Sequence, residues 1–509
     1  MTIFLVCSVG FLSCSPPPQK TVLRNEEAPI FPNYQDGTEI PYNIAPLNFT
    51  LPDTVKRVYV QIKTSSVQKT ITSKRQFFFN RKCWKELTAV AAQGRNDTIV
   101  LTITVYGKSK QYSTYPEIRW IVCPEPIDPY LTYRLVQPTA NAYKELEIRE
   151  RCLENFNEKI LVSNRLMNGN CFNCHTYHQG DANRMMMHLR NPSEGSLFFF
   201  DGETQKVRLP AVEQALVSLP DSLRMPLRFI YAAWHPESEY IAFSTNIIGL
   251  SGYTAHRQYV DLLDSASNII LYHPQMNTIL LSPVLWTADY EETWPTWSPD
   301  GKWLYFCRTP KMSPDTVQRY SEYGERVQHI FFDLCRVAFD ATTGRFSDTV
   351  QTILKSAPGK SYSIPRVHPD GNHLLVCRGL FNSVPYHALA DMELVDLQNI
   401  KDETTDNAAD ILNSPECESW HEWSSNGSWV VYGSKRQDGL YALPYFAHFD
   451  GKNFGKPFVL PQGRGNYYQT NLRAFNLPTF TRNQSALTPK KAAQAKNAPV
   501  WEIEVRDME

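Results

Sequence analysis

Residues 295–309, "PTWSPDGKWLYFCRT", decide the fold of this chain. They combine a turn at 298–301, Ser-Pro-Asp-Gly, with an uninterrupted apolar run at 303–307. Proline, aspartate and glycine supply the backbone angles that a tight turn needs. An apolar run without alternation is typical of a strand that is buried on both faces. We therefore expect a turn followed by a central β-strand.

Three further segments have the same form, and their turns differ in one respect. Where the first segment has Ser298, two of the others have His235 and His368, so we expect structural roles for both histidines. A repeated turn-and-strand unit predicts a β-propeller of about five to seven blades, here over residues 193–482. The further segments are "AAWHPESEYIAFSTN" (232–246), "PRVHPDGNHLLVCRG" (365–379) and "HEWSSNGSWVVYGSK" (421–435).

Composition excludes several classes of protein. With 51 basic and 52 acidic side chains the formal net charge is -1, so we expect no nucleic-acid partner. The chain has 11 cysteines in 509 residues, which is too sparse for a disulfide framework. Cys307, Cys335 and Cys377 lie in apolar runs and are expected to be buried thiols. The acidic pair at 291–292 precedes a strand and is expected to face solvent or to cap a turn.

The length of the chain predicts at least two domains. Short β-rich runs over residues 36–135 indicate a small β-sandwich-like domain. Residues 141–162 place apolar side chains near helical spacing and predict an amphipathic helix within a linker, 136–192. A tail, 483–509, follows the propeller. The predicted fold is thus mainly β: a sandwich-like domain, a helical linker and a C-terminal propeller.

The linker carries "NGNCFNCHTYHQG", residues 168–180, with the spacing Cys171-x-x-Cys174-His175. This spacing is the signature of covalent haem attachment. Two thiols three residues apart add to the two vinyl groups of one porphyrin edge, and His175 becomes the proximal ligand of a haem c iron. Two other readings remain open, because a Cys-x-x-Cys pair also forms a disulfide, or free thiols, or half of a zinc site.

A haem would need a sixth ligand, and the nearby segment "NRMMMHLR", residues 183–190, offers His188 or Met186. The thirteen residues from His175 to His188 are long enough, at roughly 40 Å, to pass around a porphyrin edge. Such bis-axial ligation favours electron transfer. The alternative for the methionine run is ordinary filling of a core.

The N-terminus indicates export. Residues 3–12, "IFLVCSVGFL", are too short to span a bilayer and are typical of a secretory signal. Phe11-Leu12-Ser13-Cys14 resembles a bacterial lipobox, so residues 1–14 are predicted to be a lipoprotein signal peptide and 15–35 a tether. Lipid on Cys14 would hold the protein to a membrane of a Gram-negative cell envelope, in the periplasm or at the outer membrane.

The repeats resemble the TolB-type, WD-like propeller repeat, which residues 297–302 match fully. Together with "IPYNIAPLNF" (40–49), "IDPYLTYRLVQP" (127–138) and the Cys-x-x-Cys-His segment, they resemble a family of uncharacterised exported TolB-like propeller lipoproteins. The resemblance spans most of the chain. It implies a propeller and a haem-attachment motif, and it implies no particular activity.

No hydrolase elbow, P-loop, zinc-protease or dinucleotide motif occurs, so no catalytic residue is predicted. The sequence favours an exported lipoprotein that combines binding with electron transfer through one haem. The alternative is a non-haem scaffold, or a module that binds a protein or glycan, with a Cys171–Cys174 disulfide. The inserted segment 308–328, with Tyr320 and Tyr323, is the predicted site for a partner.

Overall fold

A computed structural model describes residues 18–507, apart from residues 19, 94–97, 109, 138–144, 168, 191–195, 202, 209–223, 253–259, 320–327, 382–389 and 401–406. The predicted signal peptide and Cys14 lie outside the described residues. None of the helices in the described part of the chain is long and apolar enough to span a membrane. The chain divides into unit 1 (Met1–Pro126, Glu154–Phe156 and Gly455–Asn471) and unit 2 (Ile127–Leu153, Asn157–Phe454 and Leu472–Glu509).

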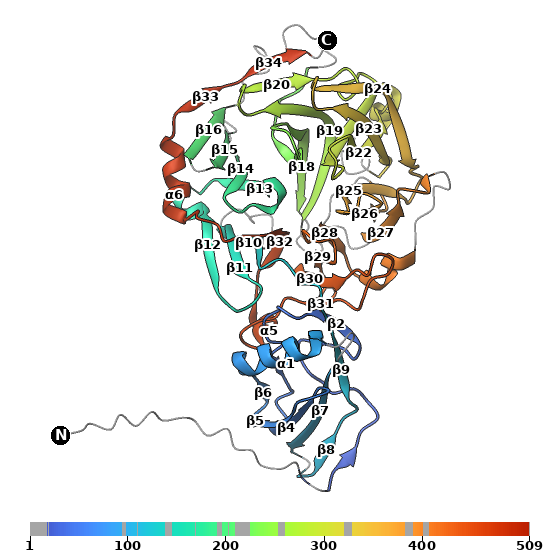
Figure 1. The fold of residues 1–509 in the computed structure, drawn as a ribbon. Coiled ribbons are helices and arrows are strands. Elements are labelled where there is room, and N and C mark those ends of the chain that lie inside the picture. The colour runs from blue at the N-terminus through green and yellow to red at the C-terminus, as the bar shows by residue number, and fades with distance from the viewer. Residues whose placement is uncertain are drawn as a thin grey trace, which may run out of the picture. The chain divides into compact units, whose positions relative to one another are not determined.

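Unit 1 is a seven-stranded sheet covered by a helix (Figure 1). The sheet has the order β1-β8-β7-β4-β5, and β9 joins β2 to β7. The strands β3 and β6 form a separate two-stranded sheet. The elements of unit 1 are β1 (Val22–Leu23), β2 (Thr38–Pro41), β3 (Phe49–Thr50), β4 (Val55–Lys63), β5 (Gln68–Ser73), β6 (Gln76–Phe77), α1 (Arg81–Gln93), β7 (Thr98–Gly107), β8 (Tyr112–Thr114), β9 (Ile118–Cys123), β31 (Phe458–Val459) and α5 (Tyr467–Thr470).

The helix α1 replaces the second sheet that a sandwich would need. Asn80 begins it, because its side-chain oxygen accepts hydrogen bonds from the backbone of Lys82 and Cys83. Trp84 is buried and packs edge-on against Trp120 of β9, with 6.1 Å between ring centroids. Unit 1 is therefore β-rich, as the sequence predicts, but its second layer is helical.

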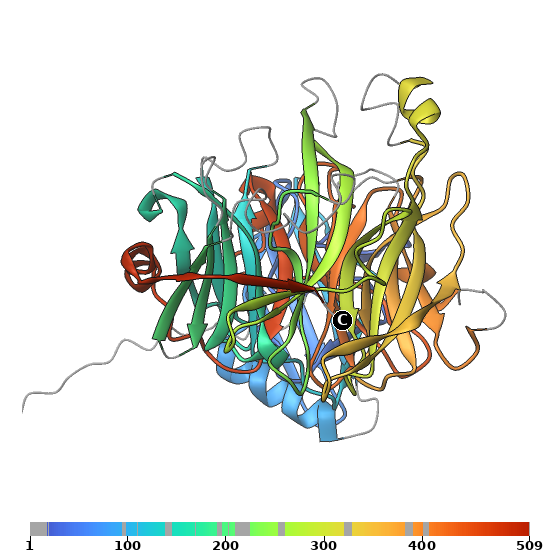
Figure 2. The same cartoon turned by 90° about the horizontal axis from the view of Figure 1, so that it is seen from above.

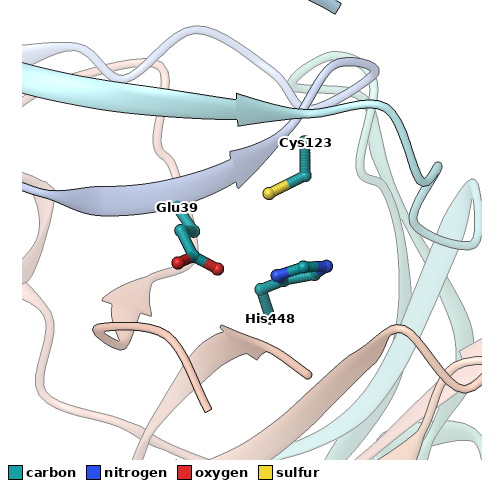
Figure 3. Close-up of side chains that lie close together, drawn as sticks. All are labelled: Glu39, Cys123 and His448. Carbon is teal, nitrogen blue, oxygen red and sulfur yellow. The ribbon is translucent and has the colours of Figure 1, made fainter. Parts of the chain in front are cut away.

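Strands β2 and β9 pair in parallel and carry Glu39 and Cys123 (Figure 3). Burial raises the pKa of the Cys123 thiol, and the nearby carboxylate of Glu39 adds to that effect. The thiol is therefore uncharged at neutral pH. His448, also drawn in Figure 3, belongs to unit 2.

Unit 2 is a β-propeller whose described residues form six sheets, seen along the propeller axis in Figure 1 and from the side in Figure 2. Two short helices, α3 (Pro314–Arg319) and α6 (Pro489–Gln494), lie outside the sheets. The first blade consists of β10 (Tyr130–Val136), β11 (Glu147–Cys152), β12 (Glu158–Ser163) and β32 (Ala474–Thr481), and the second of β13 (Cys171–Tyr177), β14 (Arg184–Arg190), β15 (Ser196–Asp201), β16 (Glu203–Arg208) and β33 (Val500–Glu502). The third blade consists of β17 (Ile230–Trp234), β18 (Ile241–Gly252), β19 (Val260–His273), β20 (Thr278–Leu281) and β34 (Glu504–Asp507), and the fourth of β21 (Tyr290–Trp297), β22 (Trp303–Pro310), β23 (Asp333–Asp340) and β24 (Arg345–Leu354). The fifth blade contains β25 (Ser361–Val367), β26 (His373–Gly379) and β27 (Asp391–Asp396), and the sixth contains β28 (Glu418–Trp423), β29 (Trp429–Ser434) and β30 (Leu443–His448).

The inner strands of the six blades contact one another in a closed ring, in the order β13, β17, β21, β25, β28 and β32. The ring closes through β32, which pairs antiparallel with β10 and so becomes the inner strand of the first blade. The predicted propeller is thus confirmed. It begins at β10, however, so the first two blades include the segment that was predicted to be a linker.

The predicted helix over residues 141–162 is wrong in its described part, because β11 and β12 form there. The charges that resemble the exposed face of a helix are paired across the sheet instead. Arg149 of β11 lies 2.7 Å from Glu147 and 2.7 Å from Glu158 of β12. Paired in this way, charged side chains can alternate with the buried residues of a strand.

The C-terminal segment is also part of the propeller. After α6, the strand β33 pairs in parallel with β16, and β34 pairs in parallel with β20. These strands cover the outer edges of two blades, which otherwise present unpaired backbone groups. The predicted tail is therefore an edge cover for the second and third blades.

Two histidines link neighbouring blades, as the repeat predicts. The Nε2 of His235 donates to the carbonyl oxygen of Gly301, at 3.1 Å, and that of His368 to Gly427, at 2.9 Å. Each glycine lies in the turn of the next blade. The structural role of both histidines is confirmed.

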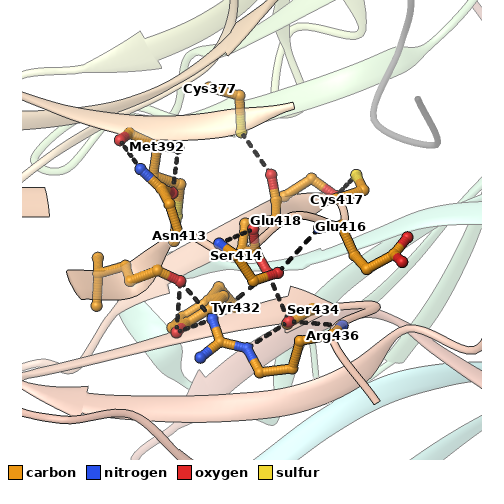
Figure 4. Close-up of polar contacts among 12 residues, drawn as sticks. Cys377, Met392, Asn413, Ser414, Glu416, Cys417, Glu418, Tyr432, Ser434 and Arg436 are labelled. Carbon is orange, nitrogen blue, oxygen red and sulfur yellow. Dashed lines mark hydrogen bonds and ion pairs between the residues drawn. The ribbon is translucent and has the colours of Figure 1, made fainter. Parts of the chain in front are cut away.

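Buried thiols and carboxylates fill the blades. Cys307, Cys335 and Cys377 are buried, as predicted. Glu418 is fully buried and accepts hydrogen bonds from Ser414 and Ser434 (Figure 4). Such partners are what make a buried carboxylate tolerable.

The pair at 291–292, predicted to face solvent, is buried. Glu292 is fully buried and lies 2.9 Å from Arg308, whereas Oε2 of Glu291 has no hydrogen-bond partner among the described residues. Burial raises the pKa of Glu291 to about 8, and Lys311 partly opposes the shift. The sequence concealed this because the ion pair with Arg308 spans two strands.

The turn glycines provide a first prediction. Gly427 and Gly371 have φ of 75° and 74°. A Cβ on Gly427 would lie 2.5 Å from the His368 ring, whereas a Cβ on Gly371 would have no described atom of another residue within 4 Å. We expect Gly371→Ala to cost about 1 kcal/mol through backbone strain. Gly427→Ala should cost about 2 kcal/mol more, because the ring must move. Urea denaturation measures both, and equal losses would contradict the blade-to-blade contact.

A second prediction concerns Glu291→Gln and pH. Between its ordinary pKa of 4.5 and about 8, the folded protein keeps a proton on Glu291 that the unfolded chain has lost. The unfolding free energy contributed by this group therefore falls as pH rises through that window. The variant lacks this loss, so its stability relative to the wild type should rise with pH over the window. A difference that stays constant in urea denaturation would show that Glu291 is solvated.

Candidate functional site

The inner strands share one irregularity that shapes the propeller axis. In each strand the pairing register shifts near its middle. At the shift, a non-glycine residue adopts a positive φ of 49° to 58° in five strands, at a cost of about 1–2 kcal/mol each. These residues are Tyr231, Trp294, Ile364, Trp420 and Leu477. A bulge re-aims the side chains that follow it, here at the axis.

Three of these residues form an aromatic plug on the axis, which we define as Tyr231, Trp294 and Trp420. The rings of Tyr231 and Trp294 stack with centroids 3.5 Å apart. Trp420 approaches their centroids to 6.2 and 5.5 Å, respectively. The three residues come from different blades, so the plug joins them across the axis.

The Cys-x-x-Cys-His segment is the inner strand β13, and the shift of register places it in line with the other blades. Its shift lies between Asn173 and Thr176. Cys174 therefore corresponds to the plug residues, and His175 to the next position, which is proline in three blades. That position is occupied by Ala232, Pro295, Pro365, His421 and Pro478 in the other inner strands.

The described residues of the motif point to different places. Cys171 packs against the apolar core that β11, β12 and β14 share, whereas His175 lines a cavity on the propeller axis. The side chain of Cys174 lies outside the described part. The predicted distal ligands lie on β14, where His188 pairs with Asn173 and Met186 is buried in the core shared with β17 and β18.

These residues do not fit a haem. A c-type haem needs both thiols and the proximal imidazole on one porphyrin edge and face. Here Cys171 and His175 face separate compartments, and the cavity beside His175 is about 50 Å³, room for a few waters. No step of the chemistry proposed below therefore passes through a haem.

The disulfide and the half zinc site fit no better, whereas the free-thiol reading agrees with Cys171. Cys171 is a free thiol, and along an extended strand residues three apart have Cα atoms separated by about 10 Å, too far for a disulfide. Among the described side chains, the groups able to hold a metal include neither Cys171 nor His175. The group His368, Asp370 and His373 belongs to a blade turn, where Nε2 of His368 already donates to Gly427.

The site that the structure does form is an axial funnel of about 410 Å³. Its floor is a ring of six residues, one from each blade, two positions after each bulge residue. The ring consists of Thr176, Ala233, Thr296, Arg366, Glu422 and Thr479. Four blades thus contribute small side chains, and two adjacent blades contribute an arginine and a glutamate.

Arg366 and Glu422 form the charged part of this ring. Nε of Arg366 lies 3.3 Å from Oε2 of Glu422, and Nη1 donates to the carbonyl oxygen of Pro365 at 2.9 Å. Its Nη2 makes no hydrogen bond to the described residues. Burial raises the pKa of Glu422, and the charge of Arg366 opposes the shift.

A small chamber lies between the ring and the plug. It has about 50 Å³ and shares Thr176, Arg366, Glu422 and Thr479 with the funnel. His175 is 4% exposed, and neither of its ring nitrogens has a partner among the described residues. Burial, with a smaller effect of Arg134, lowers the pKa of His175 to about 3, so its ring is neutral.

His421, at the same position in another blade, shows what an ordinary structural histidine does. Its Nε2 donates to the carbonyl oxygen of Leu375 at 2.8 Å, and its Nδ1 lies 3.7 Å from the Cys377 thiol. His175 has neither kind of contact. The ring could be recognised in the sequence, because four of its residues are the second residues of the four quoted repeats: Ala233, Thr296, Arg366 and Glu422. The sequence analysis did not single them out because the residue type at this position of the repeat varies.

The predicted partner segment, 308–328, divides among several places. Arg308 is in β22 and pairs with Glu292, Lys311 donates to the carbonyl oxygen of Thr287 at 2.8 Å, and 314–319 form α3. Tyr320 and Tyr323 lie outside the described residues, so their role stays a prediction.

No family profile matches the sequence, and no curated protein is similar to it. Several solved structures are similar in fold. An oligogalacturonate lyase in complex with manganese has a TM-score of 0.31 and 12% identity, covering 84% of this chain and 99% of that one. The propeller domain of the Trilobed protease from Pyrococcus furiosus has a TM-score of 0.33 and 7% identity, covering 72% and 82%.

A prolyl oligopeptidase B from Galerina marginata, bound to a 35mer substrate, has a TM-score of 0.35 and 11% identity, covering 81% of this chain and 54% of that one. At such scores these similarities carry no argument about ligand or activity. The six sheets and their closed inner ring establish the propeller by themselves.

The equivalence of β13 with the other inner strands predicts how it tolerates proline. His175→Pro should fold with little loss of stability, because three sibling strands have proline at this position. Thr176→Pro, one residue later, should cost about 3 kcal/mol or more, because Thr176 pairs with Met186. Thermal denaturation compares the two variants. If His175→Pro is as damaging as Thr176→Pro, the segment does not follow the repeat.

Proposed function

We propose that this chain is a non-haem binding module, in which the propeller holds a polar group of a ligand in its axial funnel. The observation that carries the proposal is the Arg366–Glu422 pair at the funnel floor, where four other blades have threonine or alanine. A partly buried ion pair contributes little to stability, because desolvation offsets its attraction. A pair that keeps unused donors toward a cavity is instead suited to hydrogen-bond a ligand.

The volume of the site suits the binding of a small molecule. The funnel's volume falls within the range of small-molecule pockets, about 300–1,000 Å³. A general acid or base works best with a pKa near the operating pH, and His175, with a pKa of about 3, is far from it. A rigid ring with a fixed donor and acceptor at its floor is a binding arrangement.

Export and lipid attachment through Cys14 complete the proposal. They rest on the apolar run at 3–12 and the lipobox resemblance alone. A lipid anchor would place the propeller at a membrane of the cell envelope, where a protein or glycan partner could be bound. Electron transfer is not proposed, because the described motif residues do not fit a haem.

Arg366→Met combined with Glu422→Gln tests this function. The double variant removes both charges at nearly constant volume, so the propeller should fold while ligand affinity falls at least tenfold, about 1.4 kcal/mol. A matched control is Arg378→Met with Asp391→Asn, a pair 2.8 Å apart within β26 and β27 of the same fold. The control should bind normally.

The measurement is a glycan array and a peptide array probed with the full chain, followed by titration calorimetry of each hit. Hits that are lost in the funnel variant and kept in the control support the proposal. Hits that bind both variants equally would place recognition outside the funnel and contradict it.

A further inference from the structure

The chamber under the plug contains two buried groups that need a partner. One is His175, described above. The other is Trp420, which is 9% exposed and whose Nε1 has no hydrogen-bond partner among the described residues. Both residues line the same chamber of about 50 Å³. Buried polar atoms in native proteins are nearly always hydrogen-bonded, so the chamber is built for an occupant.

The chemistry of these groups says what the occupant must offer. An indole N–H only donates, and a neutral imidazole donates through one nitrogen and accepts through the other. Trp420 therefore requires a hydrogen-bond acceptor. His175 provides a donor or an acceptor to the same chamber. A hydroxyl oxygen satisfies both groups, because it accepts and also donates.

The charges of the funnel are balanced. Arg366 is offset by Glu422, and Asp128 and Arg482 also line the funnel. Asp128 is engaged by the backbone and hydroxyl of Ser425, at 2.7 and 2.6 Å. A ligand with a net charge gains little from such a set, since each attraction is accompanied by a repulsion.

What the ring does offer is a dense set of donors and acceptors. Arg366 has an unused N–H group, Glu422 has carboxylate oxygens, and Thr176, Thr296 and Thr479 have hydroxyls. Adjacent hydroxyl groups on a ring can donate to the carboxylate and accept from the guanidinium at the same time.

We propose that the funnel ligand is an uncharged polyhydroxylated ring, such as a terminal hexose of a glycan, that spans Arg366 and Glu422 and places one hydroxyl in the chamber against Trp420 and His175. This inference rests on the proposed function and specifies its ligand class. The chamber has room for a few atoms, since one water needs roughly 10–15 Å³. One hydroxyl, with or without a water, fits that space.

Titration calorimetry of the full chain tests the ligand class. The probes are the methyl glycosides of glucose, galactose and mannose, the corresponding hexuronic acids, and the corresponding hexosamines. At least one neutral glycoside should bind, and its charged counterparts should bind at least tenfold more weakly. Preferred binding of an acid or an amine, or no binding of any neutral glycoside, overturns the inference.

Trp420→Phe tests the chamber. It removes the N–H and keeps an aromatic ring in the plug, and it should weaken the neutral glycoside at least tenfold. Trp303→Phe is the control, because Trp303 lies on β22, where Arg336 stacks over it at 4.1 Å, outside the funnel. Thr176→Val removes the hydroxyl of one residue of the six-residue ring and keeps the shape of the side chain. It replaces Trp420→Phe as the test variant if Trp420→Phe does not fold, and the same loss of affinity is expected.

The outcomes separate this inference from the proposed function. If water alone fills the chamber, Trp420→Phe leaves the affinity unchanged, and the inference is overturned. If a charged sugar or a peptide binds and is lost with Arg366→Met and Glu422→Gln, the proposed function stands and the ligand class is wrong. If array hits ignore that double variant, the proposed function itself fails.

Discussion

The pairing of β32 with β10 is the interaction on which unit 2 depends. It joins Phe475 to Leu135 and Phe480 to Leu131, residues more than 300 positions apart in the sequence, and it attaches to the first blade the inner strand that lies between β13 and β28. Because β32 contacts both β13 and β28, an unclosed ring would leave these two strands without the inner strand between them. The axial funnel exists only inside a closed ring. The ligand binding proposed at Arg366 and Glu422 would therefore depend on a contact made by the two ends of the unit.

The second constraint is the bulge in every inner strand. It holds five non-glycine residues at positive φ, and the strain is repaid by turning the next residues toward the axis. The same bulge explains why Cys171 and His175 do not meet. Cys171, before the bulge, packs against the core between blades, whereas His175, at the bulge, lines the cavity on the axis. A local motif for haem is thereby spread over two compartments by the geometry of the repeat.

The sequence predicted the four blades whose turns carry Pro-Asp-Gly, Asn-Gly or the related Pro236, because the turn chemistry is local. The first two blades lack this repeat, and their strands β11 to β14 were assigned to a linker, whereas β15, β16 and β32 lay within the predicted propeller. Charges in β11 looked like the polar face of a helix, since ion pairs such as Arg149–Glu158 form only after two strands meet. The helix α1 was missed although Asn80 and the spacing of Trp84 and Leu87 indicate it.

The candidate site was predictable only in part, for a related reason. His175 was singled out because it belongs to a local motif. The structure places it at the axis because β13 has the same bulge as the other inner strands. Arg366 and Glu422 belong to no local motif. They are 56 residues apart in the sequence, and they meet because their blades converge on one axis. Such a site can be recognised in an alignment of the repeats, at a position that has small residues in some blades and charged residues in two adjacent blades.

The Cys171-x-x-Cys174-His175 segment is a propeller strand that lines an axial site. The most direct test is the mass and absorbance spectrum of the full chain produced together with a cytochrome c maturation system. We predict that the protein carries no covalent haem and shows no haem absorbance, with Cys171 recovered as an unmodified thiol after unfolding. A denatured protein that retains one haem on Cys171 and Cys174 would contradict the account.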